Sequence, residues 1–490
     1  MASNGKTPSN GAPFQPRMLI NGQLVEASDG GKFPVHNPAT REISAQVPEA
    51  SIDDTNAAVA AAKAAFPAWS ALDPTRRGAP MKKLAALIRQ HNAELARLEA
   101  ISMGMPVSKF HYGATAAFNF DHFAEAWPSI QGQASVNTPG HVTMTLRQPY
   151  GVVALIIPWN APVHFFASKA APALITGNTV VVKSSEKAPL AIARIAELVV
   201  EAGFPPGVFN ILSGHGLPSG QTLARHMDVR ALSFTGSSRT GKLIQEDAAR
   251  TNLKKVILEL GGKSPAIVFA DADLAKAARL TAASVQANSG QVCMANTRVY
   301  VHSSVADEFL RLFKESFAAV RDGDPLAPET THGPQADEVQ YRNVMAYIEQ
   351  GSQSGKLVLG GTGKLDGMGG YFVEPTVFVD TPEDARIMKE EVFGPVVNIN
   401  TFEEEAEVVA KANDTEFGLY SAVFTRDISR ALRVAKAIES GYVAINCSSP
   451  LTGRDLPFGG YKGSGQGREG VLYTMNNFLE TKSVIIQLDS

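Results

Sequence analysis

The sequence has few cysteines and no marked excess of either charge. Only two cysteines, Cys293 and Cys447, occur among the 490 residues, and they lie far apart in the chain. A disulfide-stabilised scaffold is therefore excluded, and a reducing compartment is favoured. The formal net charge of −3 gives no reason to expect a nucleic acid or an anionic membrane surface as a partner.

A long, uninterrupted hydrophobic run is also missing. The most apolar stretch, residues 151–183, is broken by three prolines and by asparagine, histidine and lysine, which does not suit a membrane-spanning helix. Residues 1–17 lack the apolar core of a signal peptide, and their Ser, Asn, Gly and Pro content predicts a disordered tail. We therefore expect a soluble, cytoplasmic protein without a membrane partner.

The sequence does contain enough apolar residues, 44%, to form large hydrophobic cores, and its length predicts two or three domains. After residue 151, short apolar strands alternate with helices. This alternation predicts βαβ units and a doubly wound parallel sheet, which binds ligands at the carboxyl ends of its strands. The expected strands span 152–157, 179–183, 207–212, 231–234 and 255–258, and the expected helices span 162–175, 189–202, 217–226 and 240–251.

A second alternating run predicts a second α/β domain. Its expected strands span 266–269, 297–302, 396–399, 421–424 and 442–446, and its helices span 272–287, 306–320, 403–412 and 429–438. The last apolar strand, 482–488, has no local partner, so we expect it to pair with the strand at 142–146 or with another subunit.

The region before residue 150 contains a predicted hairpin and several predicted helices. The hairpin turns at Asn21-Gly22. One helix is expected to begin after an N-cap at Ser51 and to stop at Pro67, and a long amphipathic helix is expected over 75–102.

Three polar residues lie beside turns in this pattern. Cys293 follows Gly290, Glu259 ends an apolar strand before a Gly-Gly turn, and Asn160 follows the first buried strand. A thiol and a carboxylate in one cleft would suit a nucleophile and a general base, and the asparagine amide could stabilise an oxyanion. The alternatives are a buried core cysteine, a helix-capping or ion-paired glutamate and an ordinary turn asparagine. Cys447 is interpreted as a structural cysteine.

A possible phosphate-binding turn lies at residues 234–241, where a strand runs into a helix through two glycines. It matches neither G-x-G-x-x-G nor the P-loop, but helix N-terminal amides there could bind a pyrophosphate. Lys183 and Glu186 follow the neighbouring strand. A carboxylate at that position would accept hydrogen bonds from a ribose and repel a 2′-phosphate.

Seven motifs in the chain resemble those of the NAD(P)-dependent aldehyde dehydrogenase superfamily, and the resemblance extends from about Leu19 to Leu488. The motifs are Pro-Trp-Asn at 158–160, Val-Lys-Ser-Ser-Glu at 182–186, Phe-Thr-Gly-Ser at 234–237, Leu-Glu-Leu-Gly-Gly-Lys-Ser-Pro at 258–265, Gly-Gln-Val-Cys at 290–293, Glu-Glu-Val-Phe-Gly-Pro at 390–395 and Pro-Phe-Gly-Gly-Tyr-Lys at 457–462. Their common order along the chain makes a chance match improbable.

The resemblance implies an α/β fold with a Rossmann-like dinucleotide-binding domain, a second α/β catalytic domain and a small β oligomerisation element. The NAD-binding domain would comprise 18–130 and 150–261, the catalytic domain 262–465, and the oligomerisation strands 131–149 and 478–490, after a disordered tail at 1–17. A homodimer or homotetramer is expected.

The resemblance also implies a role for each matching residue. Cys293 would attack the aldehyde, Asn160 would hold the oxyanion, and Glu259 would activate the water that hydrolyses the thioester. NAD is expected as the cofactor, in preference to NADP because of Glu186, and no metal site is expected. Residues implied to bind the cofactor are Ile156, Trp159, Lys183, Ser185, Glu186, Gly216, Phe234, Gly236, Ser237, Leu260, Glu391 and Phe393.

The substrate tunnel is expected to favour a bulky or aromatic aldehyde. Many members of the superfamily have an aromatic residue where this chain has Gln286 or Ala287, and Ala161 replaces a frequent phenylalanine. The expected tunnel residues are Ala161, Phe165, Ser168, Val292, Met294, Thr452 and Phe458. Two alternatives remain: a CoA-acylating semialdehyde dehydrogenase, whose members generally lack the carboxylate of Glu259, and a catalytically retired binding or structural protein.

Overall fold

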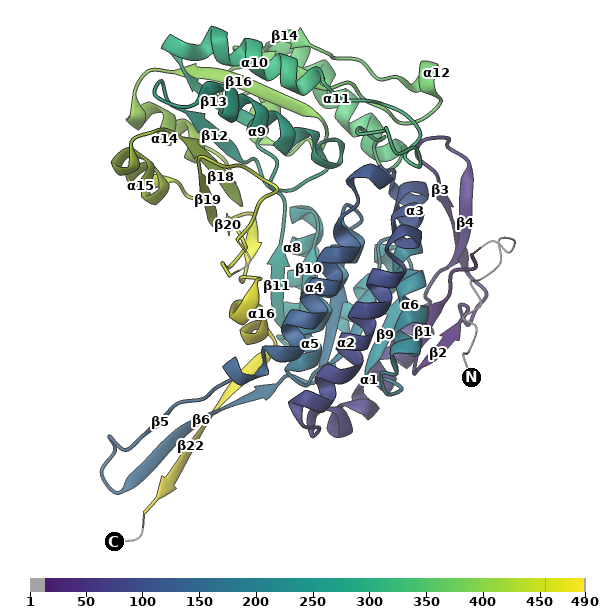
Figure 1. Ribbon diagram of the computed structural model, residues 1–490. Helices are drawn as coiled ribbons and strands as arrows, with labels where there is room; N and C mark the ends of the chain where they lie inside the picture. The colour runs from purple at the N-terminus through teal and green to yellow at the C-terminus, as the bar shows by residue number, and fades with distance from the viewer. Residues whose placement is uncertain (1–13, 454, 489–490) are drawn as a thin grey trace, which may run out of the picture.

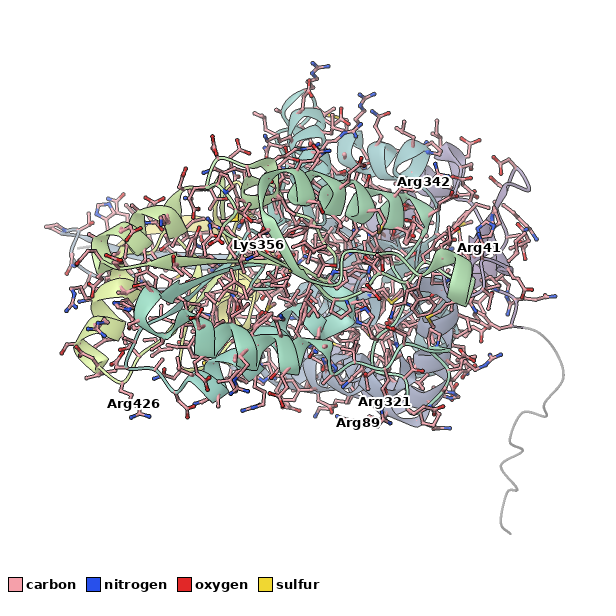
Figure 2. The ribbon with its side chains drawn as sticks, turned by 90° about the horizontal axis from the view of Figure 1, so that it is seen from above. Arg41, Arg89, Arg321, Arg342, Lys356 and Arg426 are labelled. Atoms are coloured by element: carbon pink, nitrogen blue, oxygen red, sulfur yellow. The ribbon has the colours of Figure 1, made fainter. Side chains whose placement is uncertain are left out.

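The computed structural model describes residues 14–453 and 455–488, apart from the side chains of residues 366, 471 and 472. Two α/β lobes lie one above the other in Figure 1, and a narrow arm projects from the lower lobe. Seen from above in Figure 2, the labelled basic residues lie at separate places on the molecule instead of forming one cluster. Among the described residues, no helix combines the length and apolar character needed to cross a membrane.

The first lobe contains an eight-stranded sheet in the order β2-β1-β9-β8-β7-β10-β11-β21. Its strands are β1 (Met18–Ile20), β2 (Gln23–Val25), β7 (Val152–Ile156), β8 (Thr179–Lys183), β9 (Phe209–Leu212), β10 (Val229–Thr235), β11 (Lys255–Glu259) and β21 (Gly465–Gln466). The five strands from β7 to β11 pair in parallel with one another, and the flanking strands β1 and β21 pair antiparallel to them. This confirms the predicted doubly wound pattern.

Helices cover both faces of this sheet (Figure 1). They are α1 (Ile52–Ser70), α2 (Pro74–Gln90), α3 (Asn92–Met103), α4 (Tyr112–Glu125), α5 (Pro162–Ile175), α6 (Leu190–Ala202), α7 (Gln221–Arg225) and α8 (Ser238–Ala249), with short helical turns η1 (Val107–Lys109), η2 (Trp127–Ser129) and η3 (Gly216–Gly220). Every residue of β8 is buried, as expected for a central parallel strand covered on both faces.

The second lobe contains a seven-stranded sheet in the order β14-β15-β16-β13-β12-β18-β19. Its strands are β12 (Pro265–Val268), β13 (Arg298–His302), β14 (Lys356–Leu359), β15 (Thr376–Val379), β16 (Val396–Phe402), β18 (Tyr420–Phe424) and β19 (Tyr442–Ile445). Its helices are α9 (Leu274–Gln286), α10 (Ala306–Ala318), α11 (Glu338–Ser354), α12 (Leu365–Met368), α13 (Arg386–Lys389), α14 (Glu405–Asn413) and α15 (Ile428–Ala437), with turns η4 (Ala287–Gly290) and η5 (Ser303–Val305). The predicted second α/β unit is confirmed.

The arm is a three-stranded antiparallel sheet in the order β22-β6-β5. It consists of β5 (Ala134–Ser135), β6 (His141–Pro149) and β22 (Leu479–Gln487), and α16 (Val471–Asn477) leads into its last strand. Lys482 pairs with Leu146, and Ile486 pairs with Val142. The predicted pairing within the chain is therefore confirmed, and β22 keeps its outer edge free of any described strand.

Two smaller pairings complete the described sheets: β3 (Lys32–His36) with β4 (Ile43–Pro48), and β17 (Phe417–Gly418) with β20 (Tyr461–Lys462). The hairpin predicted at Asn21-Gly22 joins β1 to β2, and both turn residues have positive φ, +52° and +76°. Such left-handed pairs match the twist of two-residue hairpins.

Two predicted helix limits are wrong. Helix α1 begins after the N-cap Ser51, as expected, but it continues through Pro67 to Ser70. Trp69 explains the continuation, because its buried indole donates a hydrogen bond to the carbonyl of Leu174 at 3.2 Å and holds the last turn against α5. The proline costs one intrahelical hydrogen bond, and this packing offsets the loss.

The single helix expected over 75–102 is two helices, α2 and α3, separated at His91. His91 leaves helical geometry with φ −98° and ψ 14°. Arg194 of α6 contacts both sides of the break, donating to Glu94 at 3.0 Å and lying 3.3 Å from the His91 ring nitrogen. A tertiary contact thus decides a boundary that the apolar stripe alone does not mark.

Helix α11 was not predicted from the sequence, and the predicted limit of the N-terminal tail is wrong. Val344 and Ile348 give α11 a buried stripe, and Asp337 caps its first turn through Gln340 N at 2.8 Å. Residues 1–13 of the predicted tail lie outside the described residues. The limit at 17 is wrong because Phe14 packs against the core and Pro16 is buried.

Candidate active site

The parallel register brings the predicted site residues to one edge of the first sheet. Ile156 lies opposite Lys183 and Phe234, and Thr235 lies opposite Glu259. These are the last residues of four neighbouring strands, so their side chains and the loops after them meet at the carboxyl edge. The edge therefore collects residues that are more than 100 positions apart in the sequence.

The loop before Cys293 has an unusual backbone. Asn288, Ser289 and Gly290 all have positive φ, +47°, +54° and +79°. A Cβ on Gly290 would lie 2.0 Å from the carbonyl carbon of Gly394, so only glycine fits there. Such strain persists only where the surroundings enforce it, and it often marks a functional site.

Gln291, which follows Gly290, fixes the position of the loop through its side chain. Its side chain is fully buried, its amide nitrogen donates to the Asn288 carbonyl at 3.0 Å, and its amide oxygen accepts from Ala336 N at 2.8 Å. Ser289 adds a hydrogen bond to the Gly333 carbonyl at 2.8 Å. These contacts hold the backbone that presents Cys293, which is itself partly exposed.

The Gly261-Gly262 turn brings three functional residues together. A Cβ on Gly262 would lie 2.3 Å from the Cys293 carbonyl oxygen, and a Cβ on Gly261 would lie 2.3 Å from the Glu391 carboxylate. Gly262 N also donates to Glu391 at 2.9 Å. Because the turn follows Glu259 directly, the absence of two side chains lets the cysteine loop and Glu391 approach that residue.

Glu259 carries a carboxyl group suited to proton transfer. The residue is 2% exposed, and neither carboxyl oxygen makes a regular hydrogen bond with a described group, although the Cys293 thiol lies beside it. Burial, followed by repulsion from Glu469, raises the pKa of Glu259 to about 8, against attraction from Lys169. A carboxyl group with a pKa near the working pH can both accept and release a proton.

The Cys293 thiol is protonated in this arrangement. Burial of the sulfur, followed by the carboxyl groups of Glu259 and Glu391, raises the pKa of Cys293 well above its usual value. The neighbouring charges therefore do not stabilise a resting thiolate. A nucleophilic sulfur at this position needs a base to take its proton, and Glu259 is the group beside it.

A buried ion pair near Glu259 escaped the sequence analysis. Lys169 of α5 pairs with Glu469, and its ammonium also donates to Ser233 at 2.9 Å. The Glu469 charge raises the pKa of Glu259, and the Lys169 charge lowers it. The only sequence signal was a lysine inside an otherwise apolar helix, and its partner lies 300 residues away.

Asn160 lies directly against the cysteine loop. Its side-chain amide donates to the Gln291 carbonyl at 3.0 Å, and the Asn288 amide donates to the Asn160 carbonyl at 3.0 Å. The structure therefore brings Asn160 and the Cys293 loop together. The amide nitrogen has a second N–H, which could serve the expected oxyanion role while the first stays on Gln291.

Lys183 and Glu186, the two residues expected to bind a ribose, lie at and just after the end of β8. The Lys183 ammonium is buried and donates to the carbonyls of Ser184 at 3.0 Å and Gly214 at 2.5 Å; burial lowers its pKa to about 8. Ser185 donates to the Glu186 carboxylate at 3.2 Å. Gly216 follows two residues after the Gly214 carbonyl and is exposed.

The start of α8 provides donors for an anion. Ser237 caps the helix through Thr240 N at 3.3 Å, and no described group accepts from the amides of Ser238 and Arg239. Gly236 has no room for a side chain, since a Cβ would lie 2.4 Å from the Phe234 ring. A Cβ on Gly241 of the same helix would lie 2.8 Å from the Leu260 side chain. Free amides at a helix N-terminus suit a pyrophosphate.

Two aromatic residues expected to bind the cofactor also meet. Trp159 packs edge-on against Phe393 with ring centroids 5.3 Å apart, and the Lys187 ammonium lies 5.2 Å from the Trp159 ring. Phe393 has φ +56°, a strained value for a bulky residue. Glu391 and Phe393 thus lie on one segment that touches both the Gly-Gly turn and Trp159.

The expected tunnel residues fall in three segments. Ala161, Phe165 and Ser168 share one side of the start of α5, and Val292 and Met294 flank Cys293. Phe458 lies 6.3 Å from the Tyr442 ring, and the segment that contains Thr452 is joined to the cysteine loop through Ser448 and Asn296, 2.5 Å apart. No described contact joins Thr452 itself to Cys293.

Comparison with known proteins agrees with this geometry. A model of the aldehyde dehydrogenase family matches residues 24–484. The chain belongs to the aldehyde dehydrogenase family. Its members are NAD(P)-dependent oxidoreductases, so the predicted family, enzyme class and nicotinamide cofactor are confirmed.

Known relatives match this chain over nearly its whole length. Retinal dehydrogenase 2 from Homo sapiens is 42% identical over 96% of this chain and 92% of that protein. The crystal structure of an aldehyde dehydrogenase from Pseudomonas aeruginosa is 41% identical, with a TM-score of 0.94 and 97% of each chain covered. A variant of the indole-3-acetaldehyde dehydrogenase from P. syringae, solved with NAD+, is 39% identical with the same TM-score and coverage.

Proposed function

We propose that this protein oxidises an aldehyde to a carboxylic acid with NAD+, through a covalent adduct on Cys293 that is hydrolysed with the help of Glu259. The observation that carries the proposal is the partly exposed Cys293 thiol beside a buried Glu259 carboxyl group without a regular hydrogen-bond partner. A nucleophile and a base in this relation support covalent catalysis.

The first half of the reaction uses Cys293 as the nucleophile. Glu259 accepts the thiol proton while the sulfur bonds to the aldehyde carbon, and the carbonyl oxygen becomes an oxyanion. The Asn160 amide and the Cys293 backbone N–H stabilise that charge. When bound, NAD+ supplies the acceptor for the hydride that leaves this carbon, and an acyl thioester then remains on Cys293.

The second half of the reaction uses Glu259 as a base toward water. Glu259 first releases the thiol proton to solvent; its carboxylate then takes a proton from a water molecule, the resulting hydroxide attacks the thioester carbon, and the C–S bond breaks. The acid leaves, and the sulfur recovers a proton. One aldehyde, one NAD+ and one water thus give one acid, one NADH and one proton.

The residues at the sheet edge fit a dinucleotide. The free amides of Ser238 and Arg239, with the close glycine at 236, suit the pyrophosphate. Glu186 and Lys183 would hold the adenosine ribose, and Glu391 with Phe393 would position the nicotinamide ribose. In this assignment, residues 18–130 and 150–261 form the cofactor domain and 262–465 the catalytic domain.

We assign NAD over NADP on the basis of Glu186. Its carboxylate stands at the end of β8 beside Ser185, where it would accept hydrogen bonds from ribose hydroxyls and repel a 2′-phosphate. Replacing Glu186 with serine should raise the KM for NAD+ and lower that for NADP+. Steady-state kinetics with both cofactors measure this, and an unchanged ratio would remove the assignment.

The substrate class we propose is a bulky or aromatic aldehyde. Ala161 and Ser168 are small side chains on the α5 face near Cys293, and they leave room that larger residues would fill. The names of two relatives refer to retinal and to indole-3-acetaldehyde, both large unsaturated aldehydes. Comparing kcat/KM for acetaldehyde, hexanal and benzaldehyde tests this, and a marked preference for acetaldehyde contradicts it.

Trapping the thioester tests the hydrolytic mechanism. Glu259→Gln should give one rapid equivalent of NADH and then slow turnover, with the acyl group visible on Cys293 by intact-protein mass spectrometry. In the CoA-acylating alternative, CoA would accelerate the wild type and yield an acyl-CoA. Absence of NADH with every aldehyde of a broad panel would favour the catalytically retired alternative.

We propose that the β5-β6-β22 arm joins subunits into a homodimer or homotetramer. The arm extends from the body, and β22 is an edge strand with unpaired backbone groups (Figure 1). Several apolar side chains on or beside it are exposed, namely Val136, Leu146, Ile485, Ile486 and Leu488. A neighbouring subunit would cover these groups.

A further inference from the structure

One face of helix α5 remains open in an otherwise buried helix. Between Pro162 and Ile175, only His164 and Ser168 keep partial exposure. These two residues are four positions apart, so they lie on the same side of the helix. With Ala161 and Phe165 they complete an i, i+3, i+4, i+7 pattern, a single helical face that begins one residue after Asn160.

This face leads away from the reacting sulfur. Asn160 contacts the loop of Cys293 through the Gln291 carbonyl. His164 follows Ala161 by three residues, which is about 5 Å along a helix axis at 1.5 Å per residue. A substrate whose carbonyl reaches Cys293 would therefore extend along this face. Its atoms about one benzene-ring length from the carbonyl carbon would lie near His164.

A second polar group faces His164. The ring of Tyr112, the first residue of α4, lies 6.1 Å from the His164 ring. Cys293 also contributes to the electrostatic environment of the Tyr112 phenol, so this ring lies on the Cys293 side of α4. The two side chains come from different helices and border the same space.

Neither side chain has a hydrogen-bond partner among the described residues. The His164 ring lies against the rings of Tyr112 and Phe165, and within the described part of the chain neither its nitrogens nor the Tyr112 hydroxyl forms a hydrogen bond. Buried polar groups are almost always hydrogen-bonded, and unpaired ones need an explanation. Neither group is sealed from solvent, so a ligand or a water molecule can supply the partner.

Both groups are uncharged at neutral pH. Burial lowers the pKa of His164 to about 4, with His111 and Lys169 acting in the same direction and Glu469 opposing them. Burial also raises the pKa of Tyr112. An imidazole offers one donor and one acceptor, and a phenol offers both, so the pair suits a neutral group that can donate and accept.

We propose that His164 and Tyr112 select an aryl aldehyde whose ring carries a hydroxyl or N–H group on the side away from the carbonyl. The proposal deepens the proposed function and rests on it. The apolar ring would lie along Ala161 and Phe165, and its polar substituent would satisfy the two unpaired side chains. A purely hydrocarbon aldehyde would leave them unpaired and should therefore bind less tightly.

A matched substrate pair tests the selection. For the full-length enzyme with NAD+, kcat/KM is measured for 4-hydroxyphenylacetaldehyde and for 4-methylphenylacetaldehyde, which have similar shapes. The wild type should prefer the hydroxylated aldehyde by about tenfold, mainly through KM. In His164→Leu and Tyr112→Phe the preference should fall about five- to tenfold, while kcat/KM for the methyl compound changes less than about threefold.

The exposed Tyr473 supplies the control variant, because Tyr473→Phe removes the same atom from a side chain that is 52% exposed and should leave the preference unchanged. A wild-type preference near one, or a preference unmoved in both α5-facing variants, overturns the proposal. If no aldehyde is oxidised, the proposed function fails separately. In that case, calorimetry measures the affinities of Cys293→Ala for 4-hydroxyphenylacetate and 4-methylphenylacetate, with and without His164→Leu. Equal affinities of Cys293→Ala for the two acids overturn the proposed selection.

Discussion

At the scale of single residues, the site depends on how Glu259 and Cys293 affect each other. Desolvation raises the pKa of both groups, and the Glu259 carboxylate raises that of the Cys293 thiol further, whereas the thiol acts on the pKa of Glu259 in the lowering direction. The resting pair therefore holds its protons, and catalysis requires one of them to leave. A pair of this kind is poised for attack only when Glu259 is deprotonated.

Replacing Cys293 with serine should abolish aldehyde oxidation while leaving the fold intact. The serine hydroxyl is a far weaker nucleophile, so kcat should fall by at least about 10³-fold. NADH production and the circular dichroism spectrum measure the two properties. Cys447→Ser is the matched control, and full activity in Cys293→Ser would contradict the mechanism.

The pH profile should report the carboxyl group of Glu259. Because its pKa is raised to about 8, the active carboxylate forms as pH increases, and log kcat/KM should rise to a plateau above about pH 8. Glu259→Gln should lower activity by about 10²–10⁴-fold and remove this ionisation. A wild-type profile that is flat between pH 6 and 9 would contradict the assignment.

The same shift predicts a change in stability. The folded state raises the pKa of the Glu259 carboxyl group from its usual value of 4.5 to about 8. The folded protein therefore becomes less stable as pH rises between these two pKa values. Glu259→Gln cannot ionise, so its Tm relative to the wild type should increase between pH 6 and 9. Thermal unfolding at several pH values measures this, and a constant difference would argue against the shift.

At the scale of structural elements, the cysteine loop is held by backbone fit more than by side chains. The three consecutive left-handed residues at 288–290 allow Gly290 to pack against the Gly394 carbonyl group. The Gly261-Gly262 turn meets the same loop from β11. Glycine is needed at these contacts because each approach leaves no space for a Cβ.

Gly290→Ala should therefore displace the loop and reduce kcat by about 10²-fold, since a misplacement of about 1 Å is sufficient for such a loss. A Cβ there would meet the backbone of Gly394 and Pro395. Gly367→Ala is the control, because its Cβ would meet nothing within 4 Å and its φ is not positive. Equal kcat values for the two variants would show that the loop tolerates the change.

At the scale of the whole molecule, the arm has exposed apolar side chains that neither lobe covers. The side chains of β22 are mostly exposed, and they include Ile485 and Ile486, which are 64% and 44% exposed. Isolated exposed apolar residues are common, but a group of them along an edge strand favours assembly.

Ile486→Lys should weaken that assembly. A charge on this strand would have to lose its hydration in a subunit contact, so the mass in solution should shift toward that of a single chain. Light scattering after gel filtration measures the mass. Leu432→Lys, a similarly exposed residue on α15, should leave it unchanged, and an unaffected oligomer in Ile486→Lys would place the contact elsewhere.

The sequence by itself determined the α/β alternation, the hairpin at Asn21-Gly22, the pairing of the last strand with 142–146 and the family. These depend on short-range hydrophobic periodicity, turn chemistry and motifs, all of which are local. Only the tertiary structure decided the break at His91, the Lys169–Glu469 pair, the contact of Asn160 with Gln291 and the unpaired His164. The contacts at these positions come from residues 52 to 300 positions away, which no local pattern contains.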